Sequence, residues 1–123
     1  MPSLQDFDGP VTVDELRFDD AVEGSGAEVK AGATVTIHYT GALASDGSIF
    51  DSSLSGGEAA QPVTFPLDRL IEGWQKGIPG MKIGGKRRLF IPSELGYGAH
   101  STGAIPANAD LIFDIELFAV EGG

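Results

Sequence analysis

The segment LDRLIEGWQKGIPG, residues 67–80, carries the one helix-like pattern of the chain. Its apolar side chains recur at helical spacing, and they are Leu67, Leu70, Ile71, Trp74 and Ile78. Asp68 stands near the start, where a carboxylate suits the helix dipole, and the glycines and proline of residues 77–80 end the segment. Gly73 inside it costs about 1 kcal/mol relative to alanine. The helix must therefore gain its stability by packing on a sheet.

The segments on either side of this helix predict such a sheet. Residues 34–41 (TVTIHYTG) alternate apolar and polar side chains with a period of two, as a half-buried strand does. Asp46-Gly47 is a strong turn signal, and an extended run starts again at Ile49. Further strands are expected over residues 11–18, at an edge, and over residues 62–65, 86–92 and 111–120. This arrangement predicts an α+β domain in which the helix covers one face of a mostly antiparallel sheet.

The length and the termini indicate one domain. A chain of 123 residues has the usual size of a single domain, and no internal repeat is visible. Residues 1–10 (MPSLQDFDGP) show little periodicity, so we expect a flexible leader before a domain over residues 11–123. The leader lacks the pattern of a signal peptide, and no apolar run approaches the ~20 residues that span a bilayer. We therefore expect a cytoplasmic location, and we assume a monomer because the sequence gives no sign of an oligomer.

The composition excludes several kinds of site. Asp and Glu total 18 against 8 Lys and Arg, a formal charge of -10, which repels phosphate backbones and anionic membranes. The chain has no cysteine, so disulfides, thiolate metal sites and cysteine nucleophiles are excluded. Metal ligands at useful spacing are missing, and we expect no metal and no cofactor. The acidic side chains over residues 6–28 indicate a solvated face, with a docking role as the alternative.

Side chains for ordinary catalysis are also missing. His38 falls on the polar face of its predicted strand, as a surface residue would, and His100 in the long loop over residues 93–108 has no paired nucleophile in sequence. What remains is an aromatic set, spread over the predicted elements: Tyr39, Phe50, Trp74, Tyr97 and Phe113. On pattern alone these residues would fill the core. Tyr97, however, stands between glycines in a polar loop and brings a hydroxyl that needs a partner.

At these residues the sequence resembles the FKBP family of peptidyl-prolyl cis-trans isomerases. Six stretches carry the resemblance, and they occur in the same order as in the family: VTIHYTG (35–41), DGSIFDSS (46–53), LIEGW (70–74), GIPGMKIGG (77–85), IPSELGYGA (91–99) and IPANADLIFDIE (105–116). The ordered set is highly specific. The resemblance implies a curved, mostly antiparallel sheet wrapped around one short helix, with a shallow apolar pocket between them. It implies an enzyme that accelerates rotation about X-Pro peptide bonds in protein folding.

The resemblance also implies the residues of that pocket. The implied substrate-binding residues are Tyr39, Phe50, Val63, Leu70, Trp74, Ile105 and Phe113, with Trp74 as the floor. The implied catalytic groups are the carboxyl of Asp51, the hydroxyl of Tyr97 and the backbone N–H of Ile71, which would donate to a bound carbonyl. Asp51 would also accept hydrogen bonds from wall residues such as Tyr39. The implied ligands are proline-containing polypeptides, with macrolides such as rapamycin or tacrolimus as inhibitors.

Two positions depart from the family pattern. Val63 stands where the family commonly has an aromatic residue, and Ala104 where it often has a bulky aliphatic one. The loop around residues 100–103 is also slightly short. We expect these departures to bear on substrate preference and macrolide affinity more than on the activity itself. The alternative function is a non-catalytic module or weak chaperone that docks proline-containing segments in the same pocket. A structural protein with a filled pocket explains Tyr97 and Asp51 poorly.

Overall fold

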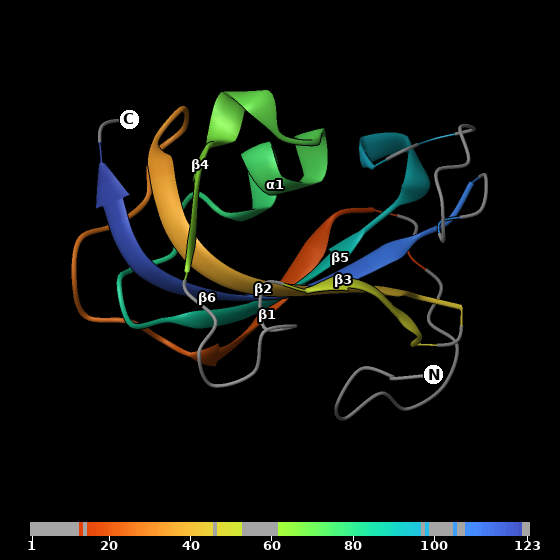
Figure 1. The fold of residues 1–123 in the computed structure, drawn as a ribbon, viewed down its shortest axis with the longest axis horizontal. Helices are drawn as coiled ribbons and strands as arrows, with labels where there is room; N and C mark the ends of the chain where they lie inside the picture. The colour runs from red at the N-terminus through yellow and green to blue at the C-terminus, as the bar shows by residue number, and fades with distance from the viewer. Residues whose placement is uncertain are drawn as a thin grey trace.

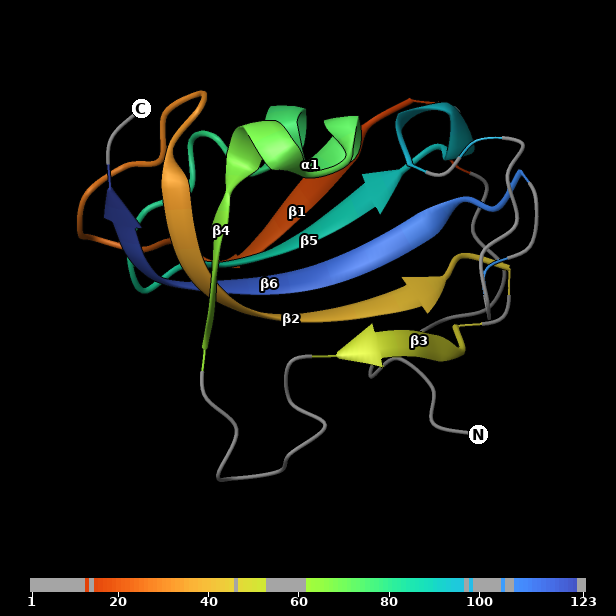
Figure 2. The same cartoon turned by 45° about the horizontal axis from the view of Figure 1, so that its top comes forward.

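A computed structural model describes residues 13, 15–45, 47–52, 62–96, 98, 105 and 108–121. Within them the chain forms a 6-stranded sheet whose neighbouring strands are all antiparallel. The strands are β1 (Arg17–Val22), β2 (Thr34–Leu43), β3 (Ile49–Ser52), β4 (Val63–Pro66), β5 (Lys86–Ile91) and β6 (Leu111–Glu121). The order is β1-β5-β6-β2-β3, with β4 also paired to β2 (Figure 2). The sheet curves beneath helix α1 (Glu72–Gly77), as Figure 1 shows.

The structure confirms the predicted fold class and most of its strands. β2 covers the segment predicted over residues 34–41, and β4, β5 and β6 match the strands predicted over residues 62–65, 86–92 and 111–120 to within one residue at each end. In β2 the alternation has the expected effect, because Val35 and Ile37 are fully buried. The leader predicted over residues 1–10 lies outside the described residues.

The first strand was predicted wrongly. It lies at the edge of the sheet, as expected, but it runs over Arg17–Val22 rather than over residues 11–18. Two adjacent aspartates disfavour a strand by propensity. Asp20 is nevertheless held there, because its carboxylate pairs with Arg87 on β5, Nε to Oδ1 at 2.6 Å.

The predicted helix is divided into two short helices. A 3-10 helix, η2 (Leu67–Arg69), is followed by Leu70 and Ile71 in extended conformation before α1 begins at Glu72. The amide of Gln75 donates to the carbonyl oxygen of Leu70 at 2.7 Å and so covers the break. The long loop likewise contains a short 3-10 helix, η3 (Ser93–Leu95). No helix among the described residues has the length and apolar character needed to cross a membrane.

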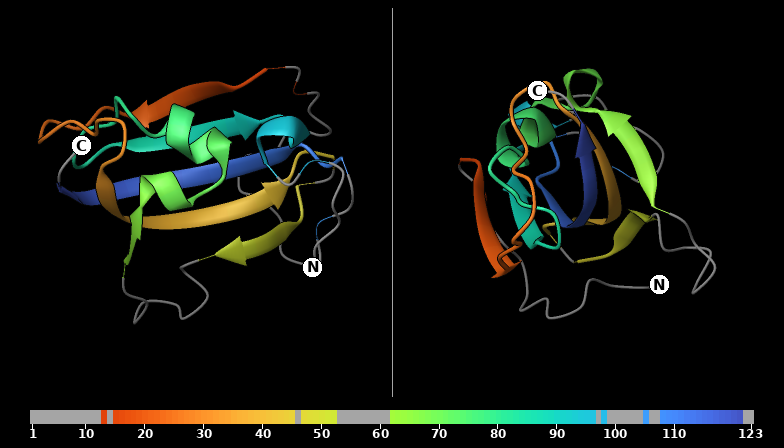
Figure 3. Two further views of the ribbon diagram at one scale, coloured as in Figure 1. Left: turned by 90° about the horizontal axis from the view of Figure 1, so that it is seen from above. Right: turned by 90° about the vertical axis from the view of Figure 1, so that its left-hand side faces the viewer.

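The main core lies between α1 and the concave face of the sheet, where the views from above and from the side place the helix (Figure 3). α1 approaches β5 closely because two of its residues are glycines. A Cβ on Gly73 would stand 2.5 Å from Cγ2 of Ile91, and one on Gly77 would stand 2.7 Å from Cδ2 of Leu89. A smaller apolar cluster on the opposite face holds Val13, Ala42, Ala44, Phe90 and Ile112.

A buried cation ties the helix to the edge of the sheet. Arg87 is 6% exposed, and its Nη1 donates to the carbonyl oxygen of Gly77 at 2.8 Å and to that of Pro79 at 3.3 Å. Its other nitrogens donate to Asp20, and its guanidinium stacks on the ring of Phe18 at 3.9 Å from the centroid. The side chain of Arg87 therefore links β1, β5 and the end of α1.

Candidate active site

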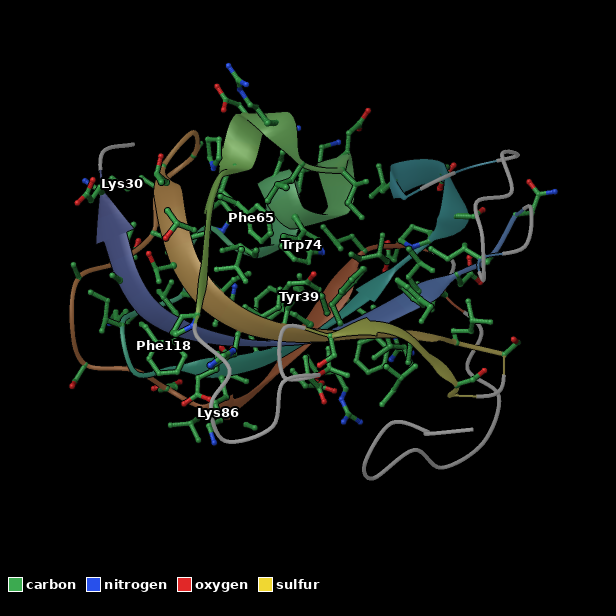
Figure 4. All side chains as sticks on the ribbon, in the orientation of Figure 1. Lys30, Tyr39, Phe65, Trp74, Lys86 and Phe118 are labelled. Carbon is green, nitrogen blue, oxygen red and sulfur yellow. The ribbon has the colours of Figure 1, made fainter. Side chains whose placement is uncertain are left out.

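Trp74 is the centre of an aromatic cluster between α1 and the sheet. Its side chain is 5% exposed, and three rings meet it edge-on, which is a favoured geometry for aromatic pairs. The ring centroids lie 5.1 Å away for Phe113, 5.5 Å for Tyr39 and 6.0 Å for Phe65. Figure 4 shows Tyr39, Phe65 and Trp74 grouped beneath the helix. The structure thus brings three of the residues predicted for the site, Tyr39, Trp74 and Phe113, into contact.

The cluster continues toward the edge of the sheet through Phe50. Its ring meets that of Phe113 edge-on, with centroids 5.6 Å apart. Gly41 on β2 makes room for this pair, because a Cβ there would stand 2.6 Å from Cε1 of Phe113 and 2.8 Å from Cζ of Phe50. Tyr39 and Phe50 are only partly buried, whereas Phe113 is 3% exposed. The rings therefore form a buried floor with more accessible walls.

The aliphatic residues predicted for the site join the same apolar cluster. Ile105 is 5% exposed and belongs to the core around Trp74. Leu70 and Ile71 are partly buried and pack against that core from the extended link before α1. Val63 is partly buried on β4, where it pairs with Ile37.

Phe65 is the wall residue that sequence reasoning missed. It lies on β4 two residues beyond Val63, and its ring meets Tyr39 at 6.1 Å and Trp74 at 6.0 Å between centroids. The signal was present in the sequence, because alternation places Val63 and Phe65 on the same face of a strand. β4 therefore contributes an aromatic ring to the cluster through Phe65, although Val63 is aliphatic.

The structure describes only some of the polar groups that were predicted for the site. Tyr97 lies outside the described residues, as do residues 100–104 with His100 and Ala104. The backbone of Asp51 is on β3 opposite Gly41, and its side chain is not described. Ile71 ends the extended link with φ -60 and ψ 152, and its carbonyl oxygen accepts from the N–H of Trp74 at 3.0 Å. Within the described residues no acceptor faces the N–H of Ile71.

The indole of Trp74 carries a second polar group that has no partner among the described residues. Its Nε1 is buried, and no described residue accepts its hydrogen bond. Leaving a buried donor without an acceptor costs about 1–3 kcal/mol. The side chains around Trp74 are apolar, although the indole itself carries an N–H group.

A separate hollow of about 140 Å³ lies beside β1 and the turn that follows α1. None of the ring-cluster residues lines it, and four of its lining residues are charged: Asp20, Glu23, Lys82 and Arg87. Arg87 is already bound by Asp20 and by two carbonyl oxygens. The hollow therefore has no free buried charge to offer a ligand, and the ring cluster is the better candidate site.

The described side chains of the ring cluster offer apolar surface for non-covalent binding. The described residues contain no group of His, Cys, Asp and Glu side chains that could hold a metal ion. Rings and aliphatic side chains form the described surface of the site. Such a site can remove an apolar ring and its adjacent amide from water, and it can hold them in one orientation.

Comparison with known proteins agrees with this chemistry. The family model described as FKBP-type peptidyl-prolyl cis-trans isomerase matches residues 25–118. An FK506-binding protein of Neisseria meningitidis serogroup B is 50% identical over 108 residues, covering 85% of this chain and 95% of its own length. The isomerase FkpA of Aeromonas hydrophila is 49% identical over 106 residues, covering 86% of this chain, which spans only 38% of that relative.

Solved structures share the fold. The crystal structure of FkpA from Escherichia coli has a TM-score of 0.78 at 39% identity, covering 93% of this chain and 52% of that one. A peptidyl-prolyl cis-trans isomerase from Pseudomonas syringae has a TM-score of 0.77 at 37% identity, covering 89% and 77%. The chain belongs to the family of FKBP-type peptidyl-prolyl cis-trans isomerases, and it is an enzyme of that class.

Proposed function

We propose that this isomerase seats the proline ring of a polypeptide against the indole of Trp74 and twists the preceding amide at the rim of the same site. The observation that carries the proposal is the ring cluster, whose floor is buried and whose walls, Tyr39 and Phe50, remain partly accessible. Concave apolar sites with few polar groups are the usual form of small-ligand sites.

Rotation about the amide needs no covalent step. The barrier of ~18–20 kcal/mol comes from resonance in the C–N bond, and uncatalysed X-Pro exchange takes tens to hundreds of seconds. A twisted amide has lost that resonance, so its carbonyl is less charge-separated and costs less to move from water into an apolar site. The enzyme only has to bind the twisted form better than either planar form. Each tenfold gain in rate needs about 1.4 kcal/mol of this differential binding.

The N–H of Ile71 is the proposed donor to the substrate carbonyl. It lies in the link between η2 and α1 and has no acceptor within the described residues, so it is available to a ligand. A donor held in place by the backbone needs no reorganisation when the amide twists. The hydroxyl of Tyr97 is proposed as a second donor, and the carboxyl of Asp51 as a group that orders the walls.

The same site is proposed to bind macrolides such as rapamycin or tacrolimus. The curated relatives named FK506-binding proteins support this proposal, because they share about half of their residues with this chain. A cytoplasmic location and a monomeric state are proposed from the sequence, and cell fractionation and light scattering test them directly.

The first test is the cis-to-trans exchange of a short X-Pro peptide, measured by exchange NMR or a protease-coupled assay. We expect acceleration that rapamycin abolishes and that Tyr97→Phe lowers. If exchange is unchanged while rapamycin still binds, the site only docks proline-containing segments.

Two substitutions isolate the proposed donor. Ile71→Pro removes the N–H and fits the observed φ of -60, and Leu70 is already extended, as a residue before proline must be. Ile71→Ala removes the same side chain but keeps the N–H. We expect a lower turnover for the proline variant than for the alanine variant. Equal turnover in the two variants would remove the Ile71 N–H from the mechanism.

A further inference from the structure

The side chain of Asp110 holds together two segments far apart in the sequence. Its Oδ1 accepts the backbone N–H of Ser93 at 2.9 Å, and its Oδ2 accepts the N–H of Val13 at 3.4 Å. Its own carbonyl oxygen accepts the N–H of Ala44 at 3.0 Å. Asp110 immediately precedes β6, so it stands at the base of the long loop where that loop returns to the sheet.

Ser93 passes this restraint on to the backbone around Tyr97. The carbonyl oxygen of Ser93 accepts the N–H of Gly96 at 3.0 Å and that of Gly98 at 2.7 Å. These two glycines are the sequence neighbours of Tyr97 on either side. The carbonyl oxygen of Gly98 then accepts the N–H of Asn108 at 2.7 Å. This bond joins Gly98 to the segment that leads into β6.

Two residues of this network adopt left-handed backbone conformations. Gly98 has φ +59 and Asn108 has φ +58, and Asn108 is the single described non-glycine residue with a positive φ. Such conformations persist where the surrounding contacts hold them. Hydrogen bonds to a carboxylate are among the stronger ones in proteins. The bond from Ser93 to Asp110 therefore ties this network to the residue that precedes β6.

We propose that Asp110 is a positioning residue of the isomerase. Its carboxylate fixes Ser93, and Ser93 fixes the backbone on both sides of Tyr97. This inference rests on the proposed role of Tyr97 and goes beyond it, because Asp110 itself is not a member of the ring cluster. A misplacement of about 1 Å at a catalytic group costs up to 10²-fold in rate.

The test compares three full-length variants in the exchange assay. Asp110→Ala removes both acceptors, and we expect kcat to fall about tenfold while KM changes little, because the floor at Trp74 and Phe113 is unaltered. Asp110→Asn keeps an acceptor oxygen, so it should restore most of the turnover. The matched control is Asp114→Ala, since Asp114 is also a carboxylate near this end of β6 but pairs with Arg88, Nε to Oδ1 at 2.6 Å.

A double-mutant cycle tests the route through Ser93. Ser93→Pro deletes the N–H that donates to Asp110 Oδ1, at the first residue of η3, where proline is tolerated. Pro92 before it has ψ 151, which suits a following proline. We expect Asp110→Ala to lower kcat little further in the Ser93→Pro background.

The outcomes separate this inference from the proposed function. An inactive parent enzyme contradicts the proposed mechanism. An active parent whose Asp110→Ala variant keeps its kcat overturns the inference alone. Fully multiplicative losses in the cycle also overturn it, as does an Asp110→Asn variant no better than alanine. If Asp110→Ala does not fold, the Asn and Ser93→Pro variants still decide the question.

Discussion

Replacing Gly73 by alanine tests how closely α1 packs on the sheet. By helix propensity alone the substitution should stabilise the protein by about 1 kcal/mol. The structure opposes this, because the new Cβ would lie 2.5 Å from Cγ2, 2.7 Å from Cδ1 and 2.8 Å from Cγ1 of Ile91. Real Cβ contacts are longer, and Ile91 is fully buried with a branched, stiff side chain. The helix must therefore move away from β5.

Overpacking of a core costs about 1–3 kcal/mol, which exceeds the gain in propensity. We expect a net loss of about 1 kcal/mol for Gly73→Ala, or roughly 3–5 °C in the melting temperature of a domain of this size. Thermal and urea unfolding measure the loss. Because Trp74 is the next residue, we also expect its fluorescence and the kcat of X-Pro exchange to change.

A second background checks the cause. Ile91→Ala removes all three contacting atoms and by itself costs about 2–5 kcal/mol. In that background Gly73→Ala should become stabilising, since the propensity gain remains and the clash is gone. A Gly73→Ala variant more stable than its parent, or one whose effect has the same sign in both backgrounds, would refute the packing described here.

Three further predictions concern separate contacts. Asp20→Ala leaves the buried guanidinium of Arg87 without its carboxylate, and we expect a loss of about 2–4 kcal/mol in urea unfolding. This is somewhat below the cost at a fully buried pair, because the side chain of Asp20 is 28% exposed. Glu72→Gln breaks an exposed pair with Lys76 at 3.6 Å and should change stability by less than about 0.5 kcal/mol, so a larger shift would contradict the reasoning. Phe65→Val removes two ring contacts, and we expect a loss of about 1–2 kcal/mol with a raised KM for X-Pro peptides, measured by thermal unfolding and the exchange assay.

The sequence predicted those features that local patterns encode. Alternation over residues 34–41 predicted β2 and its buried face, and the strands over residues 86–92 and 111–120 were equally clear. The extent of β1 was missed because it depends on a distant partner. Asp20 disfavours a strand locally, but it stands opposite Arg87, far along the chain, and its carboxylate pairs with that side chain.

The break before α1 was missed for a different reason. The spacing of apolar residues reports which side chains share a face, and it says little about the backbone between them. Leu70 and Ile71 keep the helical spacing and pack on the core, yet both are extended. This break frees the N–H of Ile71 from the helix. The feature that sequence spacing could not predict is therefore the one on which the proposed donor depends.

The site and the core share side chains, and this constrains how the enzyme can vary. Trp74 and Phe113 are 5% and 3% exposed, so any change at the floor removes buried area and lowers stability together with activity. Tyr39, Phe50 and Ile71 pack on that floor but are only partly buried. Substitutions at these walls alter the accessible surface at a smaller cost in stability. Differences in substrate preference among related chains should therefore concentrate at the walls, while the floor stays aromatic.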